Sequence, residues 1–409
     1  MSMVRWFLIM FALLLATIRS VRADDMVYFN DGRVLVGEVL KETDDEIEAK
    51  GTIAGVEFHS TFKKAQIASV IRNVSSRSPS KVEADVKDEN ASGDFLIVPL
   101  KGTFGKDIYP LGLINAMDWA VKHKVPRIVM VIDSPGGYVW ASKYMSEKMK
   151  DYDDKLNFTM VIENSISASI WPTFASDNIF ITPGGTFGGA VVYHMTNTGS
   201  AEVDMKMNSI LAAEVAAMAE KKGHSGALAK AMMMSGQQVW AVPSGNTWKL
   251  LATKPSDAPG SRQIGAGEVF TLTGADCVTY GIAGAIPDTN ESSVSHALGD
   301  LKSAGDQGAK FMDQAKTSCE GLIKQYKAWR QSLDDAAEKL TDTAQTSKDK
   351  EAVIRKIDEL TSTYTNRIGK LKERAKQLHL MPLVNAMESE DATGVRKTID
   401  KIKAKIRGK

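Results

Sequence analysis

The chain has 409 residues, with 51 basic and 50 acidic side chains and a net charge of +1. That length exceeds one ordinary domain and allows two or three. Because the charges nearly balance, we expect no net electrostatic attraction to nucleic acid, and so no nucleic-acid partner. The two cysteines, Cys277 and Cys319, are too few for a disulfide scaffold. No clustered His or Cys pattern predicts a metal site, and we expect no cofactor.

The N-terminus resembles an export signal. Arg5 precedes an apolar run over Trp6–Ile18, and Val21–Ala23 places small residues just before two aspartates. This order is typical of a secretory signal peptide over residues 1–23. We therefore expect a periplasmic or secreted protein. An uncleaved N-terminal membrane anchor is the alternative.

A small β-rich module is expected at residues 24–72. Five short strand-like patches lie at residues 26–29, 34–40, 47–49, 56–62 and 67–71. Asn30–Gly32 has the composition of a hairpin turn. Short strands at this density predict a small β-barrel-like fold with a binding or packing role. Residues 73–93 are polar and poor in large apolar groups, which predicts a linker.

Residues 94–290 alternate apolar runs with helix-like segments. Strands are expected at residues 95–100, 127–132, 158–162 and 179–182. Helices are expected at residues 111–122, from after Gly137 to Met149, near residues 168–176 and at residues 208–222. This alternation predicts an α/β domain with a parallel sheet. Continuous apolar strands predict that both faces of the sheet are covered.

Residues 291–409 are expected to be helical. Apolar side chains recur with heptad spacing at Val353, Ile357, Leu360, Tyr364 and Leu371, while Arg367 interrupts the seam. This pattern predicts a coiled-coil-like region or a helical hairpin. We expect it to contact other copies of the chain or a protein partner, with a helical cap on the main domain as the alternative.

A glycine pair follows the second strand of the α/β region. Asp133–Gly137 has the sequence DSPGG, and glycines there let backbone N–H groups face a cleft without a Cβ in the way. Such amides can stabilise the oxyanion of a tetrahedral intermediate. The alternative is an ordinary strand-to-helix turn.

Serines follow the next strand, in Asn164–Ser169. A hydroxyl at a strand-to-helix junction is exposed, and the start of a helix favours negative charge. The alternative role is a helix N-cap. Farther along, Lys206 lies between Met205 and Met207. Apolar burial lowers the pKa of a lysine and lets its neutral amine act as a base, whereas the alternative is a surface lysine.

The glycine pair, the serine and the later lysine occur in an order that resembles the Clp-like serine peptidases, especially signal peptide peptidase A and NfeD-type peptidases. The resemblance implies a ClpP/crotonase-like parallel-sheet core with a ββα superhelix. It implies Ser167 as nucleophile, Lys206 as general base, and an oxyanion hole from Gly136, Gly137 and Ala168.

The likeness extends from about Phe95 to Asp288. Within it, Trp171–Phe187 resembles the family's helix, strand and Pro-Gly turn, and Phe270–Asp276 resembles the start of its closing segment. Ser169 stands where the family usually has glycine, which would narrow the pocket. The turn after the fourth strand carries one extra residue.

Two assignments have rivals. Ser165 and Ser169 are close to Ser167, so spacing alone does not select the nucleophile. His194 lies 27 residues after Ser167, near the histidine of the cytosolic Clp proteolytic subunit. A histidine base would also need an acidic partner to orient its ring.

We therefore expect an exported, homo-oligomeric serine endopeptidase that cleaves apolar or unfolded peptide segments. A crotonase-like enzyme acting on acyl-thioesters would use the same fold and the same amides. A third possibility is a non-catalytic oligomeric scaffold, in which the β-rich module and the helical region are the working parts.

Overall fold

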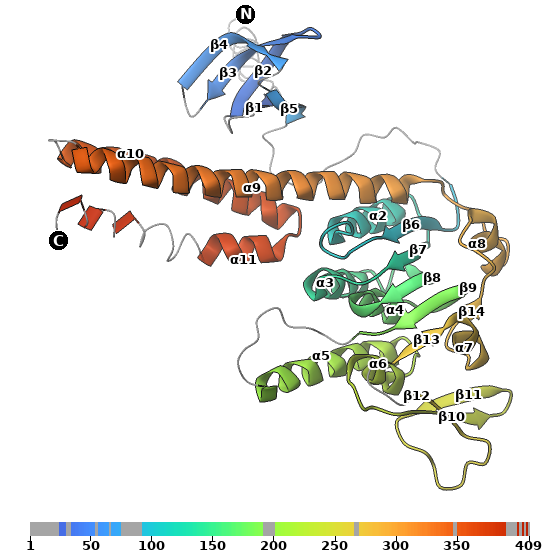
Figure 1. Ribbon diagram of the computed structural model, residues 1–409. Helices are drawn as coiled ribbons and strands as arrows, with labels where there is room; N and C mark the ends of the chain where they lie inside the picture. The colour runs from blue at the N-terminus through green and yellow to red at the C-terminus, as the bar shows by residue number, and fades with distance from the viewer. Residues whose placement is uncertain are drawn as a thin grey trace, which may run out of the picture. The chain divides into compact units, whose positions relative to one another are not determined.

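The computed structural model describes residues 24–29, 34–53, 56–64, 67–74, 92–190, 201–265, 270–346, 350–389, 399–400, 403–404 and 406–407 (Figure 1). The expected signal peptide, the Asn30–Gly32 turn, most of the expected linker and His194 lie outside these residues. The chain forms two compact units, one of residues 1–86 with 324–353 and one of residues 87–323 with 354–409. In the part of the chain so described, no helix is long and apolar enough to cross a membrane.

The β-rich module is a five-stranded antiparallel sheet with the order β4-β3-β2-β1-β5. Its strands are β1 (Asp24–Phe29), β2 (Val34–Glu42), β3 (Glu46–Ile53), β4 (Val56–Lys63) and β5 (Ile67–Val74). Alternation along β3 buries Ile47 and Ala49 on one face. The five expected strands are confirmed, and β4 and β5 form the two edges of the described sheet rather than closing a barrel.

The larger unit is built on a mixed sheet with the order β13-β9-β8-β7-β6. The strands β6 (Leu96–Lys101), β7 (Arg127–Ser134), β8 (Asn157–Ile166) and β9 (Asn178–Gly188) are parallel neighbours. β13 (Thr271–Thr273) joins β9 antiparallel, and β14 (Gly284–Ala285) joins it parallel. The expected parallel-sheet α/β core is confirmed.

Both faces of this sheet are buried, which explains its continuous apolar strands. Along β7, Ile128, Met130 and Ile132 join the main core, while Val129 and Val131 join a smaller core on the opposite face. The connecting helices are α2 (Pro110–Lys122), α3 (Val139–Lys150) and α4 (Ile170–Phe174), and the smaller core includes residues of α8 (Glu291–Ala297). A strand enclosed on both sides needs apolar residues at every position.

A small second sheet in this unit was not predicted. After α5 (Ala201–Lys221) and α6 (Gly226–Met233), the strands β10 (Val239–Ser244), β11 (Thr247–Leu251) and β12 (Arg262–Gly265) pair in the order β11-β10-β12. The hairpin between β10 and β11 turns at Gly245, whose φ of 60° favours glycine. A closer reading of Ser244–Asn246 as a turn could have found it.

The helical region begins inside the larger unit. It comprises α9 (Gln307–Thr346), α10 (Lys350–Gln377) and α11 (Met381–Ser389). Phe311 and Met312 of α9 belong to the main core. A Cβ added at Gly112 of α2 would lie 2.5 Å from the Met312 sulfur, so the absence of a side chain there permits this close packing. The first turns of α9 are therefore part of the α/β domain.

The buried face of α10 only partly follows the expected seam, since Leu360 and Tyr364 are half-buried. Ile357 and Leu371 are buried as expected, but Ile368 is buried in place of its neighbour Arg367. Cys277 and Cys319 are both buried and unpaired, so they do not form a disulfide. Burial raises the pKa of each thiol to about 12, which keeps both protonated.

The turn between α10 and α11 contacts α3. The Nδ1 atom of His379 lies 2.9 Å from the Tyr144 hydroxyl. His379 has a left-handed backbone with φ of 55° and ends α10. Burial, followed by the charge of Lys148, lowers the pKa of His379. Protonation of His379 is therefore disfavoured in the folded state.

This arrangement predicts a pH-dependent stability. A folded-state pKa below the unfolded value of ~6.5 means that stability is full above that pH and falls as the pH drops below it. We expect His379→Asn to show a smaller loss of unfolding free energy between pH 7 and pH 5 than the parent protein, as measured by urea denaturation. The same substitution should cost about 1 kcal/mol at pH 7, because the Tyr144 bond is lost.

The exposed His296 supplies the matched control, since its side chain is 85% accessible and its ion pair with the equally exposed Asp300 contributes little to stability. His296→Asn should leave the pH-dependent loss as it is in the parent protein. An unchanged loss in His379→Asn would contradict the assignment.

Candidate active site

The glycine pair forms a loop between β7 and α3. Gly136 and Gly137 have φ values of 103° and 138°, which an L side chain rarely adopts. The loop is tied to Phe104, whose N–H donates to the Gly136 carbonyl at 2.8 Å and whose carbonyl accepts from the Tyr138 N–H at 3.0 Å. A Cβ at Gly137 would lie 2.5 Å from the Phe104 carbonyl oxygen, so glycine is required for this approach.

The two glycine amides have different roles. The Gly136 N–H donates to the Ser134 hydroxyl at 3.1 Å. The Gly137 N–H makes no hydrogen bond with any residue that the structure describes. The Gly137 amide is therefore the free donor, while Gly136 shapes the loop.

Ser167 lies against this loop with an unusual backbone. It follows β8 directly, has φ of 57°, and begins a short helical turn, η2 (Ser167–Ser169), that leads into α4. A Cβ at Gly136 would lie 2.5 Å from the Ser167 Cβ and 3.0 Å from its hydroxyl oxygen. A non-glycine residue in the left-handed region is sterically strained, and such strain gathers at functional sites.

The neighbouring serines are engaged in local structure. Ser165 is fully buried, and its hydroxyl lies 2.9 Å from the Thr173 hydroxyl and 3.2 Å from that of Ser169. The Ser169 hydroxyl donates to the Ile166 carbonyl at 2.7 Å. Ser167, by contrast, is half-buried and makes no side-chain hydrogen bond within the described part of the chain. The hydroxyl of Ser167 is thus the one available for chemistry.

A second amide accompanies the serine. Ala168 is the second residue of η2, and the first N–H groups of a helical turn have no intrahelical acceptor. Ala168 is 4% exposed, so water has little access to it. Ser167, its neighbour Ala168 and the Gly136–Gly137 loop therefore lie together, as the sequence motifs predict.

Polar side chains that the sequence analysis missed connect the strands beside this loop. The Asn164 amide nitrogen donates to Asp133 at 2.9 Å, and the Thr186 hydroxyl donates to the Asn164 amide oxygen at 2.7 Å. The strand registers shift at Ile132/Asp133 and at Ile162/Asn164. These hydrogen bonds hold the ends of β7, β8 and β9 together. In the sequence, the polar residues that end each apolar run could have indicated them.

The Pro-Gly turn expected after the fourth strand is instead a bulge within β9. Ile181 pairs with Ile162, yet Thr186 already pairs with Asn164, so the four residues 182–185 bulge out of the ladder. The bulge lets one strand supply both the buried sheet and the segment beside Ser167.

Lys206 differs from expectation. It lies in α5 and is exposed, and its neighbours Met205 and Met207 are 63% and 44% exposed. The apolar burial expected around Lys206 is therefore absent in this chain. Its amine makes no hydrogen bond or ion pair with the residues described, and the alternative base His194 lies outside them.

The helix α5 is nonetheless firmly held at its other end. Lys222 donates to Asp177 at 2.7 Å and to Asp153 at 2.9 Å. Burial alone would lower the pKa of Lys222, but these two carboxylates outweigh it and raise the pKa. Two residues after Lys222, the Nε2 atom of His224 lies 2.8 Å from the Ser176 carbonyl oxygen. The far end of α5 is thus fixed to the core, and its Lys206 end is exposed.

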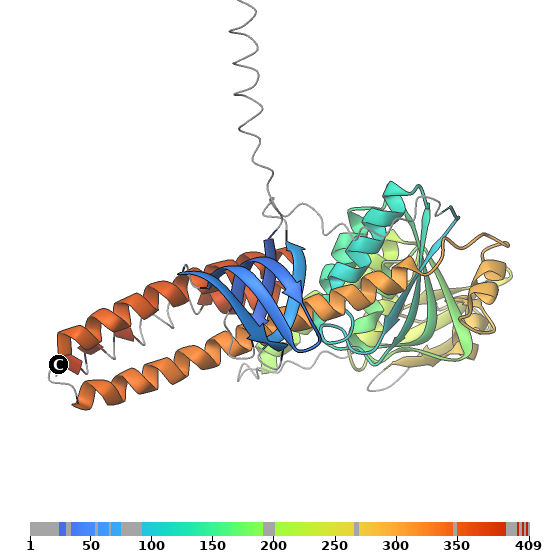
Figure 2. The same cartoon turned by 90° about the horizontal axis from the view of Figure 1, so that it is seen from above.

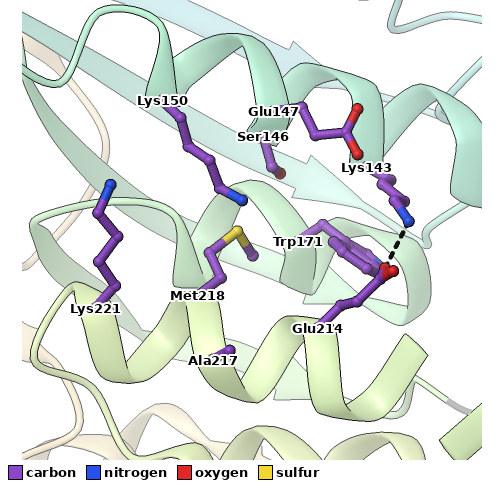
Figure 3. Close-up of a pocket in the computed structure, with 9 residues that line it drawn as sticks. All are labelled: Lys143, Ser146, Glu147, Lys150, Trp171, Glu214, Ala217, Met218 and Lys221. Carbon is purple, nitrogen blue, oxygen red and sulfur yellow. Dashed lines mark hydrogen bonds and ion pairs between the residues drawn. The ribbon is translucent and has the colours of Figure 1, made fainter. Parts of the chain in front are cut away.

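A pocket of about 440 Å³ lies between α3, α4 and α5 (Figure 3). An ion pair of 2.5 Å between Lys143 and Glu214 links α3 to α5 there, and the Lys143 amine lies 5.6 Å from the centre of the Trp171 ring. Ser167 does not line this pocket. It is therefore separate from the candidate active site, although α4 borders both.

The strain at Ser167 gives a measurable prediction. Relief of a left-handed conformation is worth about 1 kcal/mol, so Ser167→Gly should be more stable than Ser167→Ala by about that amount in chemical denaturation. Ser169 has an ordinary helical φ of −69°, so it is the matched control. There the order should reverse, with Ser169→Ala more stable than Ser169→Gly. The same order at both positions would contradict the strain.

Comparison with known proteins finds a family match for the region that contains the candidate active site. Residues 95–270 match the family model described as NfeD1b, N-terminal domain, which confirms the NfeD-type resemblance. No curated protein matches the chain.

Two solved structures resemble the chain over about half its length. One is a serine-to-alanine mutant of the 1510-N membrane-bound stomatin-specific protease, which is 14% identical in sequence with a TM-score of 0.34. The match covers 48% of this chain and 82% of the protease chain. A lysine-to-alanine mutant of the same protease in complex with a substrate peptide is 15% identical, covers 49% and 79%, and has a TM-score of 0.35. Ser167 and the glycine loop lie within residues 95–270, the segment that is similar to the N-terminal domain of NfeD1b.

Proposed function

We propose that this chain is a serine peptidase in which Ser167 attacks the carbonyl carbon of a peptide bond. One observation carries the proposal: Ser167 has a strained backbone, and its hydroxyl lies against Gly136 beside the Gly137 amide. Neither the hydroxyl nor that amide is hydrogen-bonded to another residue among those that the structure describes. A nucleophile beside preformed donors is the arrangement that acyl transfer requires.

The reaction follows from these groups. Attack by the Ser167 oxygen forms a tetrahedral intermediate whose oxyanion is held by the Gly137 and Ala168 amides. The serine proton passes to a base and then to the leaving amine, and the C–N bond breaks. Water, deprotonated by the same base, then cleaves the acyl-enzyme and regenerates the serine. No cofactor enters this scheme.

We assign the base to Lys206. Its exposed amine is not suited to this role in the unliganded single chain, because a lysine must be neutral to accept a proton. The side chains beside it are the exposed Met205 and Met207, and Ile210 is also 45% exposed. An apolar substrate segment that covered these side chains would exclude water from the amine and lower the cost of its neutral form.

The proposed substrate is an extended apolar or unfolded peptide, as the family resemblance implies. Such a peptide would bind as an added strand beside the glycine loop. We also propose that the chain is exported, that it forms homo-oligomers, and that its C-terminal helices contact other copies or a protein partner.

The principal test is hydrolysis of an apolar peptide combined with labelling by a fluorophosphonate. Ser167→Ala should abolish labelling and lower kcat/KM at least about a thousandfold. Ser165→Ala should keep both activities and lose only about 1 kcal/mol of stability from its hydroxyl bonds. Labelling that survives Ser167→Ala would refute the nucleophile.

The base is tested separately. Lys206→Ala should lower kcat as strongly as Ser167→Ala while leaving the fold intact, and His194→Ala should leave kcat unchanged. The reverse pattern in the two variants would assign the base to His194.

Two further assays separate the other functions. A crotonase-like acyl-thioester enzyme would bind coenzyme A, and the mature protein should not. A non-catalytic scaffold would form no fluorophosphonate adduct, whereas the peptidase should form one at Ser167.

A further inference from the structure

The loop that precedes α2 is the second support of the glycine pair. Residues 102–108 connect β6 to α2, and within them Phe104 makes two backbone hydrogen bonds to Gly136 and Tyr138. Phe104 is fully buried, so the loop cannot slide without disturbing the core. The position of the free Gly137 amide therefore depends on this loop.

Asp107 closes the loop from inside. Its Oδ2 atom accepts the Thr103 N–H at 3.0 Å, and its own N–H donates to the Thr103 carbonyl at 2.8 Å. A Cβ at Gly102 would lie 2.8 Å from the Asp107 side chain, so the carboxylate fills the space that glycine leaves. Thr103, which precedes Phe104, is thereby fixed by Asp107.

The other carboxylate oxygen of Asp107 is held by α9. The Lys316 amine donates to Oδ1 at 2.8 Å, so the two oxygens make different contacts. The hydrogen bond from Lys316 is the main cause that lowers the pKa of Asp107, and the Thr103 N–H adds to it. Packing of Phe311 and Met312 in the core fixes the turn of α9 that presents Lys316.

We propose that Lys316 and Asp107 are positioning residues for the oxyanion hole, so that α9 supports the site through Lys316. The inference rests on the proposed peptidase function. Lys316 orients Asp107, Asp107 fixes the Thr103–Phe104 turn, and Phe104 holds Gly136 and Gly137 in register with Ser167. Neither charged side chain contacts the substrate.

The test compares Lys316→Met, which keeps the length of the side chain but removes its charge, with Lys316→Arg, which keeps a cationic donor. We expect Lys316→Met to lower kcat about tenfold with KM unchanged, and Lys316→Arg to restore most of it. Asp107→Asn should act like Lys316→Met, because its amide oxygen still accepts from Thr103 while the ion pair is gone.

A matched control is available six residues earlier on the same helix. Lys310 makes an exposed ion pair of 2.8 Å with Asp306, and among the described residues its amine makes no ion pair with the 102–108 loop. Lys310→Met should leave kcat unchanged. An equal loss of kcat in Lys310→Met and Lys316→Met would overturn the proposal, because both losses would then be a general effect on α9.

A second readout is independent of activity. Backbone hydrogen exchange measured on peptides covering residues 102–108 and 136–138 should be faster in Lys316→Met than in the parent protein, and unchanged in Lys310→Met. Unchanged exchange together with unchanged kcat in Lys316→Met would refute the positioning role alone. Retained hydrolysis in Ser167→Ala would instead refute the proposed function, whatever the exchange shows.

Discussion

The candidate active site depends on the absence of a side chain at Gly136. Only a bare Cα there lets Ser167 approach, since an added Cβ would lie 2.5 Å from the serine Cβ. The same constraint continues at Gly137, which meets the Phe104 backbone. Three segments distant in the sequence therefore meet without intervening side chains. Their backbone groups can be arranged to within tenths of an ångström because hydrogen bonds and sterics fix them on each side.

Much of the fold could be predicted from local pattern. The run Ile128–Ile132 is purely apolar because alternate residues enter two different cores, and its strand was found almost to the residue. Gly136 and Gly137 were predicted to face a cleft because glycines leave the backbone N–H groups uncovered by a Cβ, with an ordinary strand-to-helix turn as the alternative. The choice among Ser165, Ser167 and Ser169 could not be made from spacing. It depends on a left-handed φ and on hydroxyl partners, neither of which the sequence encodes locally.

Contacts between residues far apart in the sequence could not be predicted from it. Nothing near Asp107 indicates that Lys316, 209 residues away, is its partner. The chain from Asp133 through Asn164 to Thr186 likewise requires the strand register. For Lys206 a local pattern predicted a contact that does not exist. Its methionine neighbours predicted apolar burial, but residues adjacent in a helix point to different sides. In the structure both methionines are exposed. Composition around a residue does not determine which way its helix faces.

The course of α9 decides how the polypeptide can be divided. Removal of everything after residue 290 would uncover the apolar surface under Phe311 and Met312 and leave Gly112 facing water. A fragment cut there would be prone to aggregate. The smallest fragment that folds on its own must therefore retain α9 at least through Lys316 and Cys319. Exchange of the C-terminal helices between relatives should use a junction in α9 beyond Ile323, where the helix no longer belongs to the larger unit.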